Sequence, residues 1–266
     1  MRQVVPGMPR VLSFADRTEM GAAAAADVAD ELRARLAEQD AVRMVFAAAP
    51  SQSNMLDRLV AAPGIDWSRV TAFHMDEYLE LPPGAPARFA NWLDRAVFTR
   101  LPFAEVHRIE PGSDPEATAA AYAKLLAGAP IDVVCLGIGQ NGHLAFNDPP
   151  VADLDDPVAV KVVELDHACR QQQVDDGAFA GLEDVPTHAI TLTIPRLLDA
   201  RRLFCVVPGA AKRHAVERAL HAPVSAADPA TALRTHPDVT LYLDAASGPD
   251  DVPPGPRARR NAAEAK

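Results

Sequence analysis

A glycine-rich segment in the middle of the chain combines a histidine with polar neighbours. It reads LGIGQNGHLAFNDP, from Leu136 to Pro149, and follows the apolar run IDVVC. Its glycines allow a tight turn with positive φ and let a ligand approach the backbone closely. The imidazole of His143 can move a proton near neutral pH, and Asn141 and Asp148 are polar groups able to orient it. The segment is therefore a candidate for proton transfer, with a hydrogen-bonded structural histidine as the alternative.

The same glycines formally match a dinucleotide-binding pattern. The spacing G-x-G-x-x-G occurs at Gly137, Gly139 and Gly142. Glu164 lies near the usual place of a ribose-binding acid. In a true dinucleotide site, however, the segment opens a helix that packs on the sheet, and here Pro149 follows too soon for such a helix. The sequence therefore does not predict a nicotinamide cofactor.

Two adjacent carboxylates follow another apolar run. Asp76 and Glu77 come directly after the stretch VTAFHM. Because successive side chains of a strand point to opposite faces, only one of the two can enter a given cleft. We expect one carboxylate to act in a site and the other to have a structural role, as a cap or in a salt bridge.

Two turns at strand ends offer groups that bind anions. Ser51 and Ser53, in PSQSN, precede a helical pattern, so their hydroxyls would lie beside free backbone N–H groups and the positive end of the helix dipole. Lys212 ends the stretch GAAK at the start of another helix, where a lysine is unfavourable unless it faces an anion. The alternatives are a serine that only caps its helix and a solvated surface lysine.

These groups need a fold that brings strand ends together. A helical pattern covers residues 16–37, where Asp16 and Glu19 have the spacing of a helix start. A second helical pattern follows the capping stretch SDPE at 113–116. The runs expected to be strands are RVLSF, AVRMVFAAA, RVTAFHM, IDVVCLGIG, AVKVVEL, HAITLTI, RLFCVV and VTLYLD. IDVVCLGI is apolar at successive positions, as in strands covered on both faces. The sequence predicts an α/β fold, a single three-layer α/β/α domain with a mainly parallel, Rossmann-like sheet, and ligands beyond the carboxyl ends of its strands.

Composition limits the partners and the location. The domain is expected at residues 1–246, followed at 247–266 by a disordered tail rich in Pro, Gly and charge. A net charge of −10 argues against a nucleic-acid partner. Since no apolar run approaches the roughly 18 residues of a membrane span and the N-terminus lacks a signal-peptide core, we expect no membrane partner and a cytoplasmic location. The cysteines have no CxxC spacing and are interpreted as reduced core thiols without a metal role: Cys135, Cys169 and Cys205.

Two motifs taken together resemble a known family. MDEY (Met75–Tyr78) and LGIGQNGHLAFNDP are similar, in the same order, to the F-x-M-D-E-Y and G-x-x-x-D-G-H-I-A-F-N-E-P segments of the glucosamine-6-phosphate deaminase family. DHACRQQQ and VVPGAAK also fit, so the resemblance extends from the first strand to about residue 244. It implies the three-layer α/β/α fold that the pattern of elements also predicts, and an enzyme that needs no metal or organic cofactor.

The resemblance implies catalytic roles for the matching residues. Asp76 matches the general base that moves a proton between C2 and C1 of the opened amino sugar. His143 matches the residue that assists opening of the pyranose ring. Asp148, where the family usually has Glu, matches the partner of this histidine, and Asn141 stands where the family often has an aspartate.

The resemblance also implies a phosphate site. Arg170, in HACRQ, and Lys212 match phosphate-binding residues of the family. The PSQSN turn, with Ser51 and Ser53, occupies the place of a phosphate loop, although it contains no glycine.

The implied reaction is aldose–ketose isomerisation with deamination, from glucosamine 6-phosphate to fructose 6-phosphate and ammonia. Binding of the remote phosphate would position the reacting carbons. The alternatives are a 6-phosphogluconolactonase, a phosphosugar isomerase that releases no ammonia, and a phosphosugar sensor on the same fold. Lactonases usually have Asp-Glu-Arg and no N-E/D-P segment, so DEY and AFNDP favour the deaminase. The partner is then a small phosphosugar. A homo-oligomer is compatible with the resemblance, because family members range from monomers to hexamers.

Overall fold

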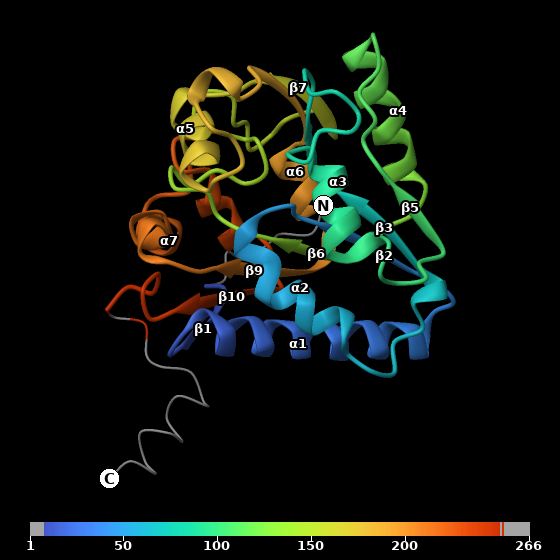
Figure 1. Ribbon diagram of the computed structural model, residues 1–266. Helices are drawn as coiled ribbons and strands as arrows, with labels where there is room; N and C mark the ends of the chain where they lie inside the picture. Colours follow the sequence, from blue (N-terminus) through green and yellow to red (C-terminus); the bar gives the residue numbers. More distant parts are fainter. Residues whose placement is uncertain (1–7, 251, 253–266) are drawn as a thin grey trace.

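The computed structural model describes residues 8–250 and 252, in which a seven-stranded sheet separates two layers of helices (Figure 1). The strand order is β1-β10-β9-β6-β2-β3-β5, and every pairing between neighbours is parallel. The strands are β1 (Arg10–Phe14), β2 (Val42–Phe46), β3 (Val70–His74), β5 (Glu105–His107), β6 (Ile131–Leu136), β9 (Ala200–Val207) and β10 (Val239–Asp244). The predicted α/β class with a mainly parallel sheet is confirmed.

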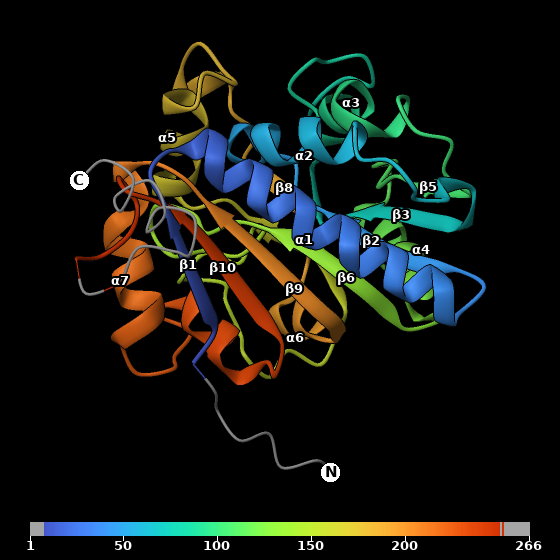
Figure 2. The same cartoon turned by 90° about the horizontal axis from the view of Figure 1, so that it is seen from below.

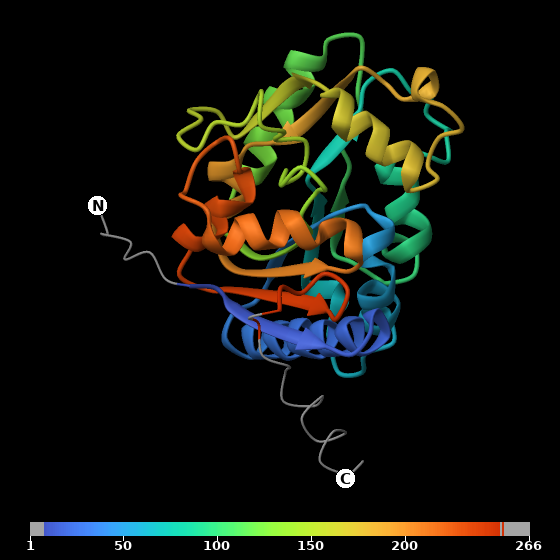
Figure 3. The same cartoon turned by 90° about the vertical axis from the view of Figure 1, so that its left-hand side faces the viewer.

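Helices cover both faces of this sheet. The long helix α1 runs obliquely across the strands on one face, beside α2 (Figure 2), and α7 lies on the opposite face of β9 and β10 (Figure 3). The helices are α1 (Arg17–Glu38), α2 (Ser53–Val60), α3 (Phe89–Leu93), α4 (Pro115–Ala127), α5 (His167–Asp175), α6 (Ile194–Leu198) and α7 (Arg213–His221). Alternate side chains of β2 enter different halves of the core, since Phe46 packs with the α1 and α2 cluster and Val45 with the α4 and α7 cluster.

The predicted helix starts correspond to real caps. The Asp16 carboxylate accepts hydrogen bonds from the backbone N–H groups of Thr18 and Glu19, so α1 starts where the sequence indicates. At α4 the cap is Asp114 and not the first serine of SDPE, because the Asp114 carboxylate accepts from the N–H of Ala117. Proline at the first helical position has no N–H to satisfy, which favours this start one residue later.

A second sheet was not expected from the sequence. β4 (Asp76–Tyr78), β8 (His188–Leu192) and β7 (Val160–Glu164) form a three-stranded antiparallel sheet in the order β4-β8-β7. The runs AVKVVEL and HAITLTI are strands as predicted, but they lie here and not in the parallel sheet. An apolar run indicates a strand and does not indicate its pairing partner. This small sheet is important for the site because β4 carries Asp76.

Close packing of α1 on α2 fixes the start of α2. A Cβ added to Gly21 of α1 would lie 2.6 Å from the Cβ of Asn54, in the first turn of α2. Glycine is therefore required for the two helices to approach this closely. The approach holds the turn between β2 and α2 at the edge of the sheet, beside the carboxyl ends of the strands.

The packed structure continues beyond the predicted end of the domain. Ser247 is buried, and its backbone N–H donates to the carboxylate of Asp244 over 2.8 Å. Ser247 therefore packs with the domain, one residue beyond the boundary predicted at residue 246. The rest of the predicted tail, residue 251 and residues 253–266, lies outside the described residues. Within the described ranges, no helix has both the length and the apolar character needed to cross a membrane.

Candidate active site

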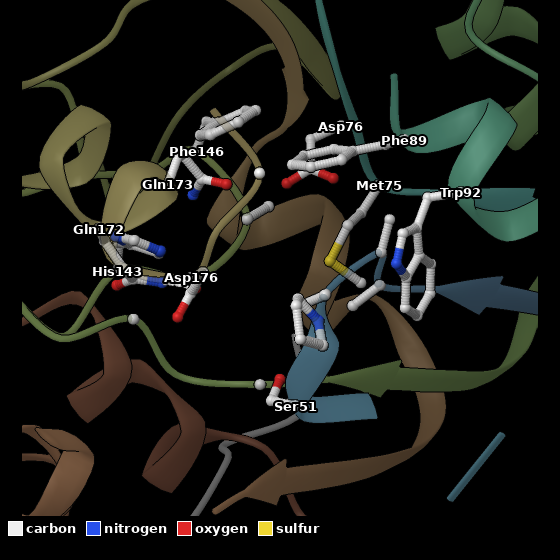
Figure 4. A pocket seen from close by; sticks show the side chains of 18 of the residues that line it. Ser51, Met75, Asp76, Phe89, Trp92, His143, Phe146, Gln172, Gln173 and Asp176 are labelled. Atoms are coloured by element: carbon white, nitrogen blue, oxygen red, sulfur yellow. Dashed lines mark hydrogen bonds between the residues drawn. The ribbon is translucent and has the colours of Figure 1, made fainter. Parts of the chain in front are cut away.

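A cavity of about 550 Å³ lies beyond the carboxyl ends of the parallel strands (Figure 4). Residues that follow four of these strands line it: Ala47 after β2, Met75 after β3, Gly137 after β6 and Pro208 after β9. This is the location expected for ligands in an open parallel sheet. The cavity also brings together four residues singled out in the sequence, from four separate segments: Ser51, Asp76, His143 and Lys212.

Asp76 extends from β4 into this cavity. Its side chain is 6% exposed, and burial together with the neighbouring Glu77 raises the pKa of its carboxyl well above the ordinary range. A carboxylate whose proton affinity is raised in this way is a stronger base. Asp76 can therefore accept and return a proton at one end of the cavity.

Glu77 points to the other side of β4, as the alternation of strand side chains predicts. Its carboxylate accepts hydrogen bonds from the backbone N–H groups of Tyr78, Phe89 and Ala90, at 2.9–3.0 Å. The Arg88 guanidinium lies 3.7 Å away. Glu77 thus anchors the start of α3, and the expected division between one cavity carboxylate and one structural carboxylate is confirmed.

His143 is held by a carboxylate and an amide from its own loop. Its Nδ1 lies 2.9 Å from Oδ1 of Asp148, and the Nδ2 group of Asn141 donates to the same oxygen over 2.8 Å. The Oδ1 atom of Asn141 in turn accepts from the backbone N–H of His143. Asn141 does not line the cavity, so it acts on the imidazole only through these bonds.

Asp148 is fully buried and yet remains an acid of low pKa. Burial alone would raise the pKa of its carboxyl, but the charge and hydrogen bond of His143 and the hydrogen bond from Asn141 lower it below the ordinary value. Asp148 is therefore ionised at neutral pH. An ionised carboxylate beside His143 stabilises the imidazolium that forms when the ring accepts a proton.

Glycine at position 139 makes room for the imidazole. A Cβ on Gly139 would lie 2.2–2.4 Å from three atoms of the His143 ring, which excludes any larger residue. Gly142 has φ +85°, a conformation that favours glycine. Two of the three glycines thus shape a turn around a side chain, which is a different use from cradling a dinucleotide.

β8 joins the His143 loop to the strand of Asp76. The backbone N–H of Phe146 donates to Oγ1 of Thr191, and Thr191 is also the pairing partner of Asp76 across the two strands. Asn147, also in the loop, donates from Nδ2 to the carbonyl of Leu192. The loop of His143 and the carboxylate of Asp76 therefore share one support.

The turn after β2 places Ser51 in the cavity wall. Pro50–Gln52 forms a 3₁₀ turn before α2, and no side chain caps either helix start, so the alternative of a simple capping serine does not apply. The Ser51 hydroxyl instead accepts from Nε2 of Gln52 over 3.2 Å. Ser53 is half-buried as the first residue of α2 and does not line the cavity.

Lys212 lies at the same end of the cavity as the Pro208 turn and is not a surface residue. It is 9% exposed, and burial lowers the pKa of its ammonium to about 8, although the nearby Asp176 offsets part of this effect. A buried cation with incomplete compensation favours an anionic ligand.

Arg170 lies outside the cavity wall, so the structure does not support the phosphate role implied for it. Its guanidinium donates to the carbonyls of Leu182 and Val185, at 2.7 and 2.8 Å, and holds the chain that follows α5. The same helix instead presents Gln172 and Gln173 to the cavity (Figure 4).

The sequence did not single out several residues of the wall. Arg17, at the start of α1, reaches the cavity from a distant part of the chain, and its NH2 group donates to the carbonyl of Pro50 at 3.5 Å. Cys169 is a buried thiol, as predicted, but it lies beside His143 and Asp148. Aromatic and apolar side chains complete the wall near Asp76: Phe89, Phe146, Met75 and Trp92.

The chain is similar to proteins of known activity over most of its length. Residues 15–242 match the family model described as glucosamine-6-phosphate isomerases/6-phosphogluconolactonase. A glucosamine-6-phosphate deaminase of Exiguobacterium sp. strain AT1b is 38% identical over 184 residues, which cover 69% of this chain and 70% of that protein.

Solved structures share the fold. A monomeric glucosamine-6-phosphate deaminase has a TM-score of 0.82 and 25% identity, covering 90% of this chain and 98% of its own. A 6-phosphogluconolactonase from Shewanella baltica has a TM-score of 0.72 and 19% identity, covering 90% of this chain and 99% of its own. At the latter identity the likeness concerns the fold alone.

The buried ammonium of Lys212 should lower the stability of the protein. Its pKa is about 8 in the folded chain against an ordinary 10.5. The penalty is therefore complete below pH 8 and disappears as the pH rises towards 10.5, because in that range the unfolded chain binds more protons. We expect Lys212→Met to raise the free energy of unfolding at pH 7 by about 1–3 kcal/mol in urea titrations. The gain should shrink at pH 10.

Lys124→Met, at an exposed position of α4, is the matched control and should change stability little at either pH.

Inorganic phosphate should raise the melting temperature of the wild type and not that of Lys212→Met. A variant that is less stable than the wild type at pH 7 would contradict the assignment of a strained buried cation.

Proposed function

Because the chain belongs to the family of glucosamine-6-phosphate isomerases and 6-phosphogluconolactonases, we propose that it converts glucosamine 6-phosphate and water to fructose 6-phosphate and ammonia. One observation carries the proposal. A single cavity holds a buried base, Asp76, and the imidazole of His143 hydrogen-bonded to Asp148, and carries Ser51 and Lys212 in its wall as groups for a phosphate. Isomerisation of an aldose phosphate requires a base, a group that opens the ring and a phosphate site in one cavity.

The phosphate binds at the turn after β2. The Ser51 hydroxyl and the ammonium of Lys212 hold its oxygens. Arg17 adds a guanidinium above this turn. We assign to Arg17 the phosphate-binding role that the resemblance implies for Arg170. Binding at this end fixes the sugar carbons relative to Asp76.

His143 opens the pyranose ring. With its Nδ1–H donating to Asp148, the imidazole presents Nε2 as the exchanging atom, which accepts the proton of the O1 hydroxyl and delivers a proton to the ring oxygen. The ionised Asp148 stabilises the imidazolium between the two transfers. The product of this step is the open-chain aldehyde.

Asp76 then moves a proton between adjacent carbons. It removes the proton from C2 and returns it to C1. Because O1 gains a proton and the amine nitrogen loses one in the same isomerisation, the aldehyde and amine become a hydroxymethyl group and an imine at C2. Water adds to C2, the amine leaves as ammonia, and the ketone of fructose 6-phosphate remains. No step calls for a metal or an organic cofactor. We also propose a cytoplasmic location, where a phosphorylated sugar would be available.

Two substrates distinguish the deaminase from its alternatives. The purified protein is incubated with glucosamine 6-phosphate and, separately, with 6-phosphogluconolactone, and ammonia, ketose phosphate and lactone hydrolysis are measured. Ammonia and fructose 6-phosphate in equal amounts are expected. Lactone hydrolysis alone would identify a lactonase, ketose without ammonia an isomerase, and binding without turnover a sensor.

Asp76→Asn tests the base. The amide keeps the shape of the side chain and loses its basicity, so kcat for ammonia release should fall by about 100- to 10,000-fold with little change in binding of fructose 6-phosphate by calorimetry. Undiminished turnover would assign the proton transfer to another group.

Arg17→Ala tests the source of the guanidinium. We expect KM for glucosamine 6-phosphate to rise by about 10-fold, which corresponds to roughly 1.4 kcal/mol for one charge-assisted hydrogen bond, with kcat nearly unchanged. Arg58→Ala, an exposed arginine of α2, is the control and should behave as the wild type. Equal KM values in the two variants would remove Arg17 from the phosphate site.

A further inference from the structure

Three different donor groups form a buried cluster beside α5. They are the imidazole of His143, the carboxylate of Asp148 and the thiol of Cys169, and their donor atoms all lie within 4.8 Å of one another. Their exposed fractions are 8%, 0% and 1%. Among the described residues, no other group of three such side chains is as closely placed.

We propose that this cluster binds one zinc ion and that bound zinc reversibly blocks the active site. The binding itself depends only on the three side chains. The blocking rests on the proposed function, because it requires that His143 and Asp148 take part in turnover. The ion is an inhibitor in this proposal and not a cofactor.

The donor types and their spacing suit zinc. Zn²⁺ prefers tetrahedral sites with nitrogen, sulfur and carboxylate ligands at about 2.0–2.3 Å, which places the ligand atoms about 3.3–3.6 Å apart. His143 Nδ1 and Asp148 Oδ1 are already 2.9 Å apart, and the thiol is within 4.8 Å of both residues' donor atoms. Shortening the longer of these separations to this range would complete three corners of a tetrahedron.

One oxygen of the Asp148 carboxylate could accept a further interaction. Oδ2 of Asp148 is buried without a hydrogen-bond partner at normal distance, whereas Oδ1 interacts with both His143 and Asn141, and the only further donor to this carboxylate among the described side chains is the thiol of Cys169. A buried charged oxygen without a partner is unfavourable. A cation at this position would provide the missing interaction.

Charge balance also favours a divalent ion. Asp148 and Cys169 are both buried, so as a carboxylate and a thiolate ligand they need a compensating cation. Zinc binding forms the Zn–S bond as the thiol proton leaves to solvent, and the Zn–N bond as the Nδ1 proton of His143 is replaced by one on Nε2; nothing is oxidised or reduced. One Zn²⁺ then neutralises the carboxylate and the thiolate, which a buried site requires.

The ion would lie on the Nδ1 side of the imidazole. His143 lines the cavity, while Asp148 and Cys169 lie behind it. A water molecule can fill the remaining corner. Zinc held in this way occupies the Nδ1 atom of His143 and the carboxylate that stabilises its imidazolium, so the ring can no longer exchange protons with the sugar.

Cobalt is the spectroscopic probe for the binding. The wild type should bind one Co²⁺ per chain and show thiolate-to-cobalt charge-transfer absorption, which zinc abolishes on displacement. Cys169→Ala and the isosteric Cys169→Ser should lose this absorption and bind Zn²⁺ more than about 100-fold more weakly, since loss of an outer partner alone costs roughly 10–100-fold. Cys205→Ala, which removes an equally buried thiol in β9, should retain both properties. Circular dichroism and melting temperature establish that each variant is folded.

The activity measurement is separate from the binding measurement. Zinc should inhibit ammonia release by the wild type and by Cys205→Ala, chelation should restore it, and any activity of Cys169→Ser should resist the same zinc concentration. Absence of a thiolate band in the wild type, or its persistence in both Cys169 variants, would overturn the site. Equal inhibition of wild type and Cys169→Ser would overturn the blocking role. If the wild type has no deaminase activity, the cobalt titration still decides the binding.

Discussion

The hydrogen bond from the backbone N–H of Phe146 to Oγ1 of Thr191 is the interaction on which the geometry of the site depends. Thr191 pairs with Asp76 across the small antiparallel sheet, so the same residue of β8 supports the His143 loop and the base. A second link, from Asn147 to the carbonyl of Leu192, prevents the loop from rotating about the first. Groups that come from distant parts of the chain are thereby held by one strand. This explains why the fold adds a second sheet to the parallel one at this edge.

The charges in the cavity are arranged at a cost to the stability of the empty protein. Burial raises the pKa of Asp76 and lowers that of Lys212, so each is disfavoured in its charged form. In the proposed reaction, the phosphate of the sugar would be the anion beside the ammonium of Lys212, and the C2–H bond would face the carboxylate of Asp76. Binding energy gained at the phosphate end can then be used to hold the carbons where Asp76 reaches them. Strain of this kind is common where function and not folding determines the residue.

The sequence predicts the elements of this fold better than their partners. Every run expected to be a strand is one, because apolar runs between turn residues depend on local pattern. The sequence does not show that two of these runs leave the parallel sheet, since pairing is decided by tertiary contacts. The same limit applies to side chains. Asp76, His143, Ser51 and Lys212 follow strand ends and could be found by that rule, whereas Arg17 reaches the cavity only through the crossing of α1. The face of α5 that turns Arg170 away depends on how that helix docks.

The chain departs from the motif it resembles at Asn141 and Asp148. The two departures depend on each other because the side chains of these residues are hydrogen-bonded. The Asn141 amide uses both of its ends, donating to Asp148 and accepting from the backbone of His143. An aspartate at position 141 has no N–H to donate, and its carboxylate would lie at hydrogen-bond distance from a fully buried anion. Two such carboxylates must share a proton or separate. With the carboxylate placed at 148 on a short stem, a neutral donor at 141 is therefore the arrangement that keeps Asp148 ionised beside His143.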